Sequence, residues 1–466
     1  MKNANAFYRF MVVLVCALAL LACGNSGSGD GSGGSPALYL YANDGVTGYE
    51  LYGSNGTASG TSLIKDINPQ GSSYPREYVV INNVTYFGAY DTTNGRELWR
   101  TDGTESGTYM VKDINAGALD SSPNNIKAVG GTLFFTAADS AGDRELWKSD
   151  GTEAGTVRVK DINTAGSSSP YYLTAVNSTL YFTAYDSLWD QELWKSDGTD
   201  AGTVRVKDIN TAGSSYLSNL TAVGGTLYFV AYDSAWDSEL WKSDGTDAGT
   251  VRVKNINTIG SSSPSYLTAV GNTLYFTAYD SAWDYELWKS DGTDAGTVRV
   301  KDINTAGNGS PYYLTAVGNT LYFGANDGVS GYELWKSDGT DAGTVRVKDI
   351  NPGPASSSPS YITVVGNTLY FTADDGVSGY ELWKSDGTEA GTVLVRDIYF
   401  GANSGSPGCL TAVGKILYFG AYDAETGFEL WKSDGTEAGT EQVLDLFPGA
   451  GSGLYMINGH TCESYD

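Results

Sequence analysis

The chain has 466 residues, with 54 Asp and Glu against 28 Lys and Arg, a formal net charge of −26 and one histidine. A surface this acidic repels nucleic acid and anionic lipid head groups, so we expect no nucleic-acid partner. The histidine, His460, lies near the C-terminus, and the sequence has no HExxH, P-loop or GxSxG motif. An ordinary Ser-His-Asp, Cys-His or metalloprotease site is therefore not expected.

Residues 1–22 are predicted to form a lipoprotein signal peptide. Two basic residues precede an apolar run at 11–21, which is too short to span a bilayer. The run ends in Leu-Leu-Ala-Cys-Gly, which resembles the bacterial lipobox. The resemblance implies cleavage before Cys23 and lipidation of that cysteine. A secretory signal with a chance cysteine is the alternative.

The Gly/Ser-rich segment at 23–35 predicts a flexible tether. We expect a folded body in the cell envelope, anchored through Cys23, and Gly24 favours the outer membrane or cell surface over the inner membrane. Cys409 and Cys462 remain after processing, in a compartment where disulfides persist. The sequence leaves open whether they pair, and it has too few Cys and His for a zinc site.

Residues 36–460 are built from a repeated unit. The motif ELWKSDGTDAGT and its variants occur nine times, with their glutamates 47 or 48 residues apart. A constant period in this range indicates a repeat architecture in which each copy is one supersecondary unit.

One unit predicts four short strands, at 267–270, 273–279, 285–289 and 297–303. They are rich in β-branched and aromatic residues, tight-turn residues separate them, and helical periodicity is absent. Repeated four-stranded antiparallel sheets are typical of the blades of a β-propeller. The predicted fold class is all-β.

The two ends of the array complement each other. Residues 37–44 match the second strand of a unit, and no first strand precedes them. Residues 454–458, after the last complete unit, resemble a first strand. This predicts a ring of nine blades closed by strands from both termini, followed by a short tail at 461–466. Propellers usually have about four to eight blades.

The repeated motif resembles that of the bacterial ELWxxDGT repeat proteins. The resemblance covers residues 37–447, and eight of the nine copies keep the core motif. It implies an extracytoplasmic protein with a propeller-like fold, and it implies no common activity.

Most motif residues have structural interpretations. Trp288 is expected in the core between blades, and Ser290 to Thr293 is expected to form a turn. A weak or shared Ca²⁺ site at Asp291 and Asp294, with their repeat equivalents, is the alternative for that turn, and no other cofactor is expected. Arg299 is expected to pair with acidic residues of the blades or to be a solvated residue at the blade edge, and not to form an anion site.

The loops between the second and third strands, here called tips, differ between units. Three consecutive tips read DSLWD, DSAWD and DSAWD, and they contain Trp189, Trp236 and Trp283. The segments that lead to the next blade, here called crossings, are expected to bring tyrosines to the same face of the ring, among them Tyr172, Tyr216 and Tyr266. Aromatic faces beside hydrogen-bonding groups suit sugar rings or a protein partner. Packing over the adjacent tip, or recent duplication of these units, is the alternative.

The sequence thus predicts a lipid-anchored β-propeller that acts as a binding or adhesion scaffold for a protein or glycan partner. The alternative is a structural envelope component whose acidic surface binds divalent cations. A glycosidase-like enzyme with a carboxylate pair is third. We expect no enzyme, because the carboxylates of this chain are repeated residues and an active site needs singular ones.

Overall fold

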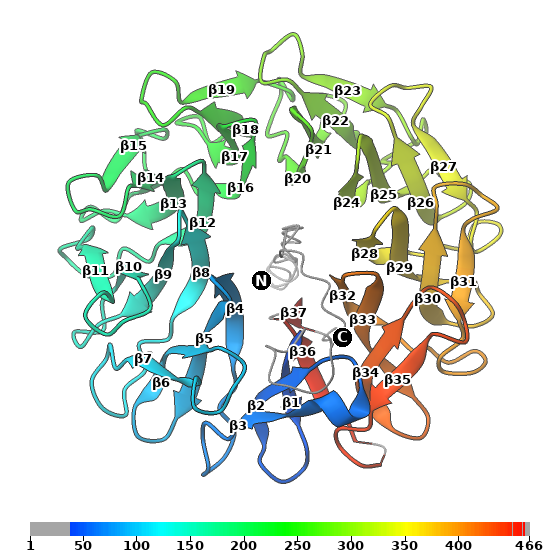
Figure 1. Cartoon of the computed structure of the whole chain (residues 1–466). Coiled ribbons are helices and arrows are strands. Elements are labelled where there is room, and N and C mark those ends of the chain that lie inside the picture. The colour runs from blue at the N-terminus through cyan, green and yellow to red at the C-terminus, as the bar shows by residue number, and fades with distance from the viewer. Residues whose placement is uncertain (1–37, 450, 459, 462–466) are drawn as a thin grey trace, which may run out of the picture. The chain divides into compact units, whose positions relative to one another are not determined.

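The computed structural model describes residues 38–449, 451–458 and 460–461. They belong to the second of two units of the chain, Gly34–Asp466. Nine antiparallel sheets form a ring, the arrangement of a β-propeller (Figure 1). The predicted all-β class and nine blades are confirmed. The predicted signal peptide, Cys23 and the tether lie outside the described residues, and no helix in the described part is long and apolar enough to cross a membrane.

We number the blades one to nine, starting with the blade that contains β1. The innermost strands, in blade order, are β36 (Leu454–Ile457), β4 (Arg76–Ile81), β8 (Asn124–Val129), β12 (Tyr171–Val176), β16 (Ser218–Val223), β20 (Ser265–Val270), β24 (Tyr312–Val317), β28 (Ser360–Val365) and β32 (Gly408–Val413). The second strands are β1 (Leu38–Asn43), β5 (Val84–Asp91), β9 (Thr132–Ala138), β13 (Thr179–Tyr185), β17 (Thr226–Tyr232), β21 (Thr273–Tyr279), β25 (Thr320–Asn326), β29 (Thr368–Asp374) and β33 (Ile416–Asp423).

The third strands are β2 (Tyr49–Ser54), β6 (Gly95–Thr101), β10 (Arg144–Ser149), β14 (Gln191–Ser196), β18 (Ser238–Ser243), β22 (Tyr285–Ser290), β26 (Tyr332–Ser337), β30 (Tyr380–Ser385) and β34 (Gly427–Ser433). The outer strands are β3 (Thr61–Lys65), β7 (Tyr109–Lys112), β11 (Val157–Lys160), β15 (Val204–Lys207), β19 (Val251–Lys254), β23 (Val298–Lys301), β27 (Val345–Lys348), β31 (Val393–Arg396) and β35 (Glu441–Leu444). Blade 1 also carries β37 (His460–Thr461), and a 3-10 turn, η1 (Ala58–Gly60), precedes β3.

Of the four strands predicted in blade 6, the second has its predicted bounds, Thr273–Tyr279. The first begins two residues earlier than predicted, at Ser265, and the third ends one residue later, at Ser290. The outer strand differs most. In blade 6 that strand is Val298–Lys301, shorter than the predicted 297–303. Its chain leaves the sheet after Lys301 because the amide of Ile303 donates to the Glu286 carboxylate, at 3.0 Å, instead of to a neighbouring strand.

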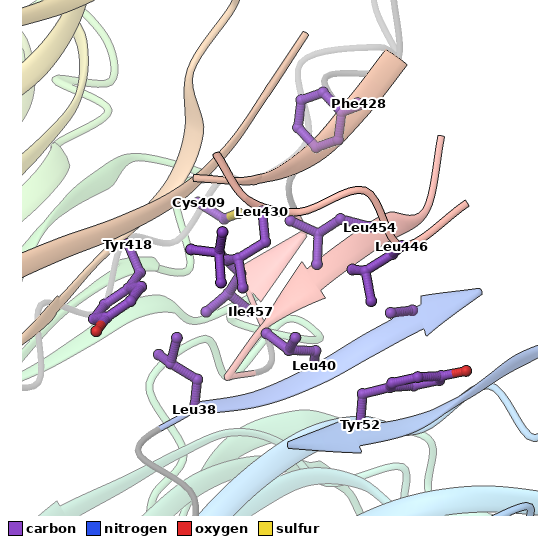
Figure 2. Packing of buried hydrophobic residues seen from close by; sticks show 12 residues of the cluster. Leu38, Leu40, Tyr52, Cys409, Tyr418, Phe428, Leu430, Leu446, Leu454 and Ile457 are labelled. Atoms are coloured by element: carbon purple, nitrogen blue, oxygen red, sulfur yellow. The ribbon is translucent and has the colours of Figure 1, made fainter. Parts of the chain in front are cut away.

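The ring is closed within blade 1, as predicted. The C-terminal β36 pairs antiparallel with the N-terminal β1. Asn458 and Tyr39 exchange two hydrogen bonds of 2.8 Å at this junction. The buried side chains of the junction come from blades 9 and 1 and include Leu38, Leu454 and Ile457 (Figure 2). Cys409 belongs to the same cluster and is disulfide-bonded, whereas Cys462 lies outside the described residues.

The core lies between neighbouring blades. Phe276 faces Trp288 across β21 and β22, and both pack with Tyr228 and Leu240 of blade 5. Phe276 is fully buried and Trp288 is 8% exposed. The repeated tryptophan is therefore a core residue between blades, as the sequence predicts.

Motif residues also join each blade to the next by polar contacts. Lys195 of blade 4 donates to the Gly245 carbonyl in the turn of blade 5, at 2.8 Å. The same contact closes the ring, where Lys432 of blade 9 reaches the Gly56 carbonyl of blade 1, at 3.1 Å. The turn that carries the glycine thus fits against the preceding blade.

Candidate functional site

The SDGT turn satisfies its own polar groups. In blade 6, one carboxylate oxygen of Asp291 accepts hydrogen bonds from the Thr293 hydroxyl, at 2.7 Å, and the Thr293 amide, at 2.8 Å. These bonds lower the pKa of Asp291. Asp294 instead pairs with Lys254 of the preceding blade, at 2.9 Å. Both residues of the predicted cation site therefore already have protein partners. Neither belongs to a cluster of three or more acids within the described part of the chain.

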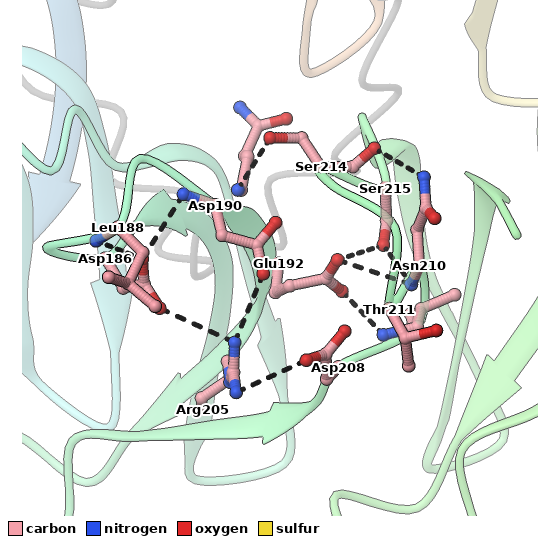
Figure 3. Close-up of polar contacts among 12 residues, drawn as sticks. Asp186, Leu188, Asp190, Glu192, Arg205, Asp208, Asn210, Thr211, Ser214 and Ser215 are labelled. Atoms are coloured by element: carbon pink, nitrogen blue, oxygen red, sulfur yellow. Dashed lines mark hydrogen bonds and ion pairs between the residues drawn. The ribbon is translucent and has the colours of Figure 1, made fainter. Parts of the chain in front are cut away.

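The motif glutamate holds the crossing that follows its own blade. Glu192 in β14 is fully buried, and its carboxylate accepts from the Ile209 amide, at 2.9 Å, and from the Ser215 hydroxyl (Figure 3). Burial raises the pKa of Glu192 to about 7, although these hydrogen bonds lower it. Sequence reasoning missed this role, although every copy of the motif keeps the glutamate.

Two blades also bring three acids together beside this glutamate. In blade 4 these are Asp190, Glu192 and Asp208, with carboxylate oxygens within 4.8 Å of one another. Blade 6 repeats the arrangement with Asp284, Glu286 and Asp302. Blade 5 lacks the third acid because Asn255 replaces it.

An arginine already neutralises part of this charge. Arg205 lies 3.3 Å from Asp190 and 3.6 Å from Asp208 (Figure 3). Burial raises the pKa of Asp190, and the neighbouring Asp208 and Asp186 raise it further. One buried oxygen each of Asp190 and Asp208 has no hydrogen-bond partner, so the group could hold a cation beside Arg205. The corresponding Arg299 lies 2.8 Å from Asp284, which confirms the predicted pairing with blade acids.

The three tip tryptophans lie on the face that the tips share with the crossings. Tips and crossings are joined by hydroxyl contacts such as Ser187 to Thr164, at 3.0 Å. Trp189, Trp236 and Trp283 are 57%, 53% and 53% exposed. Their blades are adjacent, so the same exposed indole recurs three times along this part of the ring.

Each tip tryptophan has a left-handed backbone. The φ angles of Trp189, Trp236 and Trp283 are 60°, 62° and 61°. Blade 3 has Gly142 at this position, with a φ of 84°. Both residue types make the same turn bond: the Trp189 amide donates to Asp186 and the Gly142 amide to Asp139, each at 2.9 Å. A bulky residue with this backbone costs about 1–2 kcal/mol, whereas glycine adopts it freely.

Each tip tryptophan lies beside the tyrosine that ends the second strand of its blade. Their ring centroids lie 6.4, 6.3 and 6.0 Å from those of Tyr185, Tyr232 and Tyr279. Sequence reasoning missed these three tyrosines, although a terminal Tyr in the second strand accompanies every tip tryptophan.

Of the predicted tyrosines, the structure brings one to a tip tryptophan. Tyr216 is 50% exposed and lies 6.2 Å from Trp236. Tyr172 packs on Tyr171, at 4.6 Å, and Tyr266 is 41% exposed; both belong to innermost strands. Within the described residues, neither is paired with a tip indole.

The sequence matches no protein-family model and no curated protein. Similar solved structures include a puromycin hydrolase, with 13% identity, a TM-score of 0.38, and 77% of this chain and 59% of that chain covered. The acylaminoacyl peptidase of Pyrococcus horikoshii has 11% identity and a TM-score of 0.39, with 80% and 53% covered. The β-propeller domain of the Trilobed protease from Pyrococcus furiosus has 10% identity and a TM-score of 0.36, with 70% and 99% covered. The chain thus spans little more than half the length of the first two.

These similarities correct one prediction. The expectation that the chain is not an enzyme is wrong as an exclusion. The solved structures that it resembles include a hydrolase and a peptidase. The exclusion relied on missing motifs and on the repetition of the carboxylates, and neither argument covers singular residues that ring closure brings together. At these identities and TM-scores the likeness shows the fold alone, so it assigns no activity to this chain.

Proposed function

We propose that this chain is a lipid-anchored β-propeller of the cell envelope, related to the ELWxxDGT repeat proteins. It serves as a scaffold that binds a glycan or protein partner. Cys23 provides the anchor, at the outer membrane or cell surface. The partner binds the exposed indoles of blades 4 to 6, together with Tyr216.

One observation carries this proposal. Three consecutive blades keep an exposed tryptophan where the backbone favours glycine, and blade 3 has glycine at that position. Strained and exposed aromatic residues are unfavourable for stability, and such strain clusters at functional sites. Indole faces beside tyrosines and aspartates suit the apolar faces and hydroxyls of sugar rings.

The test replaces Trp189, Trp236 and Trp283 by glycine, which reproduces the tip of blade 3. We expect the triple variant to keep the melting temperature within about 2 °C, because relief of backbone strain offsets the lost ring packing. We expect it to lose binding by at least about 30-fold for ligands found on a glycan array or by pull-down.

Val46, Val329 and Val377 are exposed tip residues of blades without tip tryptophans, so their replacement by glycine is the control. Retention of full binding by the tryptophan triple variant, for every ligand of the wild type, would refute the proposal.

A second candidate function is cation binding by the acidic scaffold. The Asp-Glu-Asp groups of blades 4 and 6 favour it, since each offers clustered carboxylate oxygens. In this case Ca²⁺ binds at Asp190, Glu192 and Asp208, and not at Asp291 and Asp294.

Millimolar Ca²⁺ is expected to raise the melting temperature of the wild type. The double change Asp208→Asn and Asp302→Asn, which reproduces Asn255 of blade 5, is expected to abolish the increase. Thermal scans with Ca²⁺ and with EDTA provide the measurement, and an equal increase in both proteins would refute this site.

A further inference from the structure

A hollow of about 560 Å³ lies between blade 1 and blade 2, apart from the tip tryptophans. Its lining combines Tyr41 and Tyr49 of blade 1, Tyr74 of the crossing, Arg76 of β4 and Arg96 of β6. The C-terminal strand β36 adds Tyr455. Ring closure thus builds this hollow from both ends of the chain. Its volume is in the range of small-ligand sites, about 300–1,000 Å³.

The two arginines set this hollow apart in an acidic protein. No other innermost strand in the described ring begins with a basic residue at the position of Arg76. The arginines of the outer strands, such as Arg205 and Arg299, pair with aspartates. Neither Arg76 nor Arg96 forms an ion pair within the described part of the chain. The hollow therefore carries two guanidinium groups that form no salt bridge, although Asp120 lies near Arg96 and Glu77 is next to Arg76.

Arg96 is a buried residue of the lining. It is 8% exposed, and one guanidinium nitrogen donates to the Tyr74 carbonyl, at 2.8 Å. Burial and the neighbouring Arg76 together lower the pKa of Arg96 to about 10, and Asp120 acts in the opposite direction. A guanidinium remains charged at neutral pH under these conditions. A buried guanidinium without a salt bridge is costly, so an anion that enters the hollow and contacts both arginines gains from charge-assisted hydrogen bonds.

Four tyrosines form the walls. The ring of Tyr41 lies 5.0 Å from that of Tyr49, 4.9 Å from that of Tyr455 and 6.2 Å from that of Tyr74. Tyrosines in such a cluster offer both ring faces and phenol hydroxyls to a ligand. The lining thus suits a ligand that has a compact ring, several hydroxyl groups and an acidic group.

We propose that this hollow binds an acidic saccharide, with a uronate carboxylate on Arg76 and Arg96 and the sugar ring among the tyrosines. A planar carboxylate fits the fork geometry of guanidinium donors. At physiological ionic strength the Debye length is about 8 Å, so the distant acidic surface does not prevent approach of a short oligosaccharide. The site uses none of the tip tryptophans and does not depend on the function proposed above.

Isothermal titration calorimetry tests the proposal with uronate trisaccharides (galacturonate, mannuronate and glucuronate) and with neutral maltotriose, in 150 mM NaCl. We expect at least one uronate to bind, and maltotriose to bind at least about tenfold more weakly. Arg76→Gln changes an exposed side chain, and it should weaken uronate binding at least about tenfold with an unchanged melting temperature. Arg96→Gln should weaken binding at least as much.

Arg144 provides the matched control. It occupies the position of Arg96 in blade 3 and donates to the Ser122 carbonyl at 2.8 Å, but Asn124 stands where blade 2 has Arg76. Arg144→Gln therefore removes the same structural bond and should leave uronate affinity unchanged, as should the triple tryptophan-to-glycine variant. Failure of every uronate to bind, equal binding of maltotriose, unchanged affinity of Arg76→Gln, or a preference for an acidic peptide would overturn the proposal.

Discussion

At Gly245 the backbone has a φ of 88°, and an added β-carbon would lie 2.3 Å from the Tyr181 hydroxyl of the preceding blade. The same relation recurs between blades 9 and 1, where Tyr418 approaches Gly56. The glycine of the motif thus serves two needs: it adopts the left-handed turn, and it leaves room for a neighbour's tyrosine. A sequence pattern suggests only the first.

Gly245→Ala is therefore expected to destabilise the protein by about 2–4 kcal/mol, through backbone strain and the contact with Tyr181. Gly271→Ala is the control, since Gly271 has a φ of 58° with nothing within 4 Å of an added β-carbon. It should cost only about 1 kcal/mol. Urea unfolding measures both, and equal losses would contradict the role of Tyr181.

The motif glutamates make stability depend on pH. Burial raises the pKa of Glu192, Glu239 and Glu286 from 4.5 to about 7. A carboxyl whose pKa is higher in the folded chain contributes fully to stability below its unfolded pKa, and this contribution is lost as pH rises through the folded pKa. We expect the melting temperature to fall between pH 5 and pH 7.5. Thermal scans at constant ionic strength measure it, and a rise over this interval would contradict the assignment.

Among the elements, the crossings have no ladder partners over most of their length, and the motif glutamate is one of the side chains that hold them. Ile209 of blade 4 donates its amide to Glu192, and Ile256 of blade 5 donates to Glu239, at 2.9 and 3.1 Å. These amides lie beyond the end of the outer strand, so the glutamate accepts the hydrogen bond that a neighbouring strand would otherwise accept. The crossings in turn support the tips through the serine and threonine hydroxyls.

Glu192→Gln leaves one of the donors around Glu192 without an acceptor, at a cost of about 1–3 kcal/mol. We expect faster hydrogen exchange at the Ile209 amide and unchanged exchange at Ile256, which serves as an internal control in the next blade. Exchange followed by mass spectrometry or NMR provides the measurement. Equal protection of Ile209 in the variant and the wild type would show that the glutamate does not hold the crossing.

The strands were predictable from sequence, and the contacts of the crossings were not. Strand β21 has its predicted bounds because alternation and turn residues are local signals. The partners of Glu192 lie in the next crossing, and local patterns do not encode such pairings. The place of Trp236 in a tip was likewise predictable, whereas its exposure and its position beside Tyr232 depend on the turn geometry.

At the scale of the whole molecule, closure by β36 places hydrophobic side chains in a cluster shared by blades 9 and 1. Leu454 and Ile457 are 1% and 0% exposed. Without β36, the strand β1 would expose an unpaired edge, which favours aggregation.

Truncation after residue 449 is expected to lower the melting temperature by more than about 10 °C and to produce aggregates, because it removes two buried aliphatic side chains and opens a strand edge. Truncation after Asn458 keeps β36 and its bonds to Tyr39, and should remain monomeric. Both are compared in reductant, so that the disulfide of Cys409 does not distinguish them. Thermal scans measure the melting temperature and size-exclusion chromatography measures aggregation. Equal results for the two truncated proteins would contradict the role of β36.

Closure also explains why the hollow beside Arg76 could not be predicted. Arg76 and Arg96 are unremarkable in sequence, since each occupies a position that varies among units. Tyr455 joins them from the opposite end of the chain, through the pairing of β36 with β1. The repeat pattern predicted the ring, but it did not show which singular residues the junction would bring together.

The contacts of Lys195 with Gly245 join one unit to the next, and closure repeats them between Lys432 and Gly56. A recombination event that copies one 47-residue unit therefore joins surfaces that already fit, at every boundary inside the array. The near-identical units 4 to 6 have the form such an event leaves. Unequal crossing-over can thus change the number of blades by whole units. The strands that close the ring, β1 to β3 from the N-terminal side and β36 from the C-terminal side, lie outside the units that are copied.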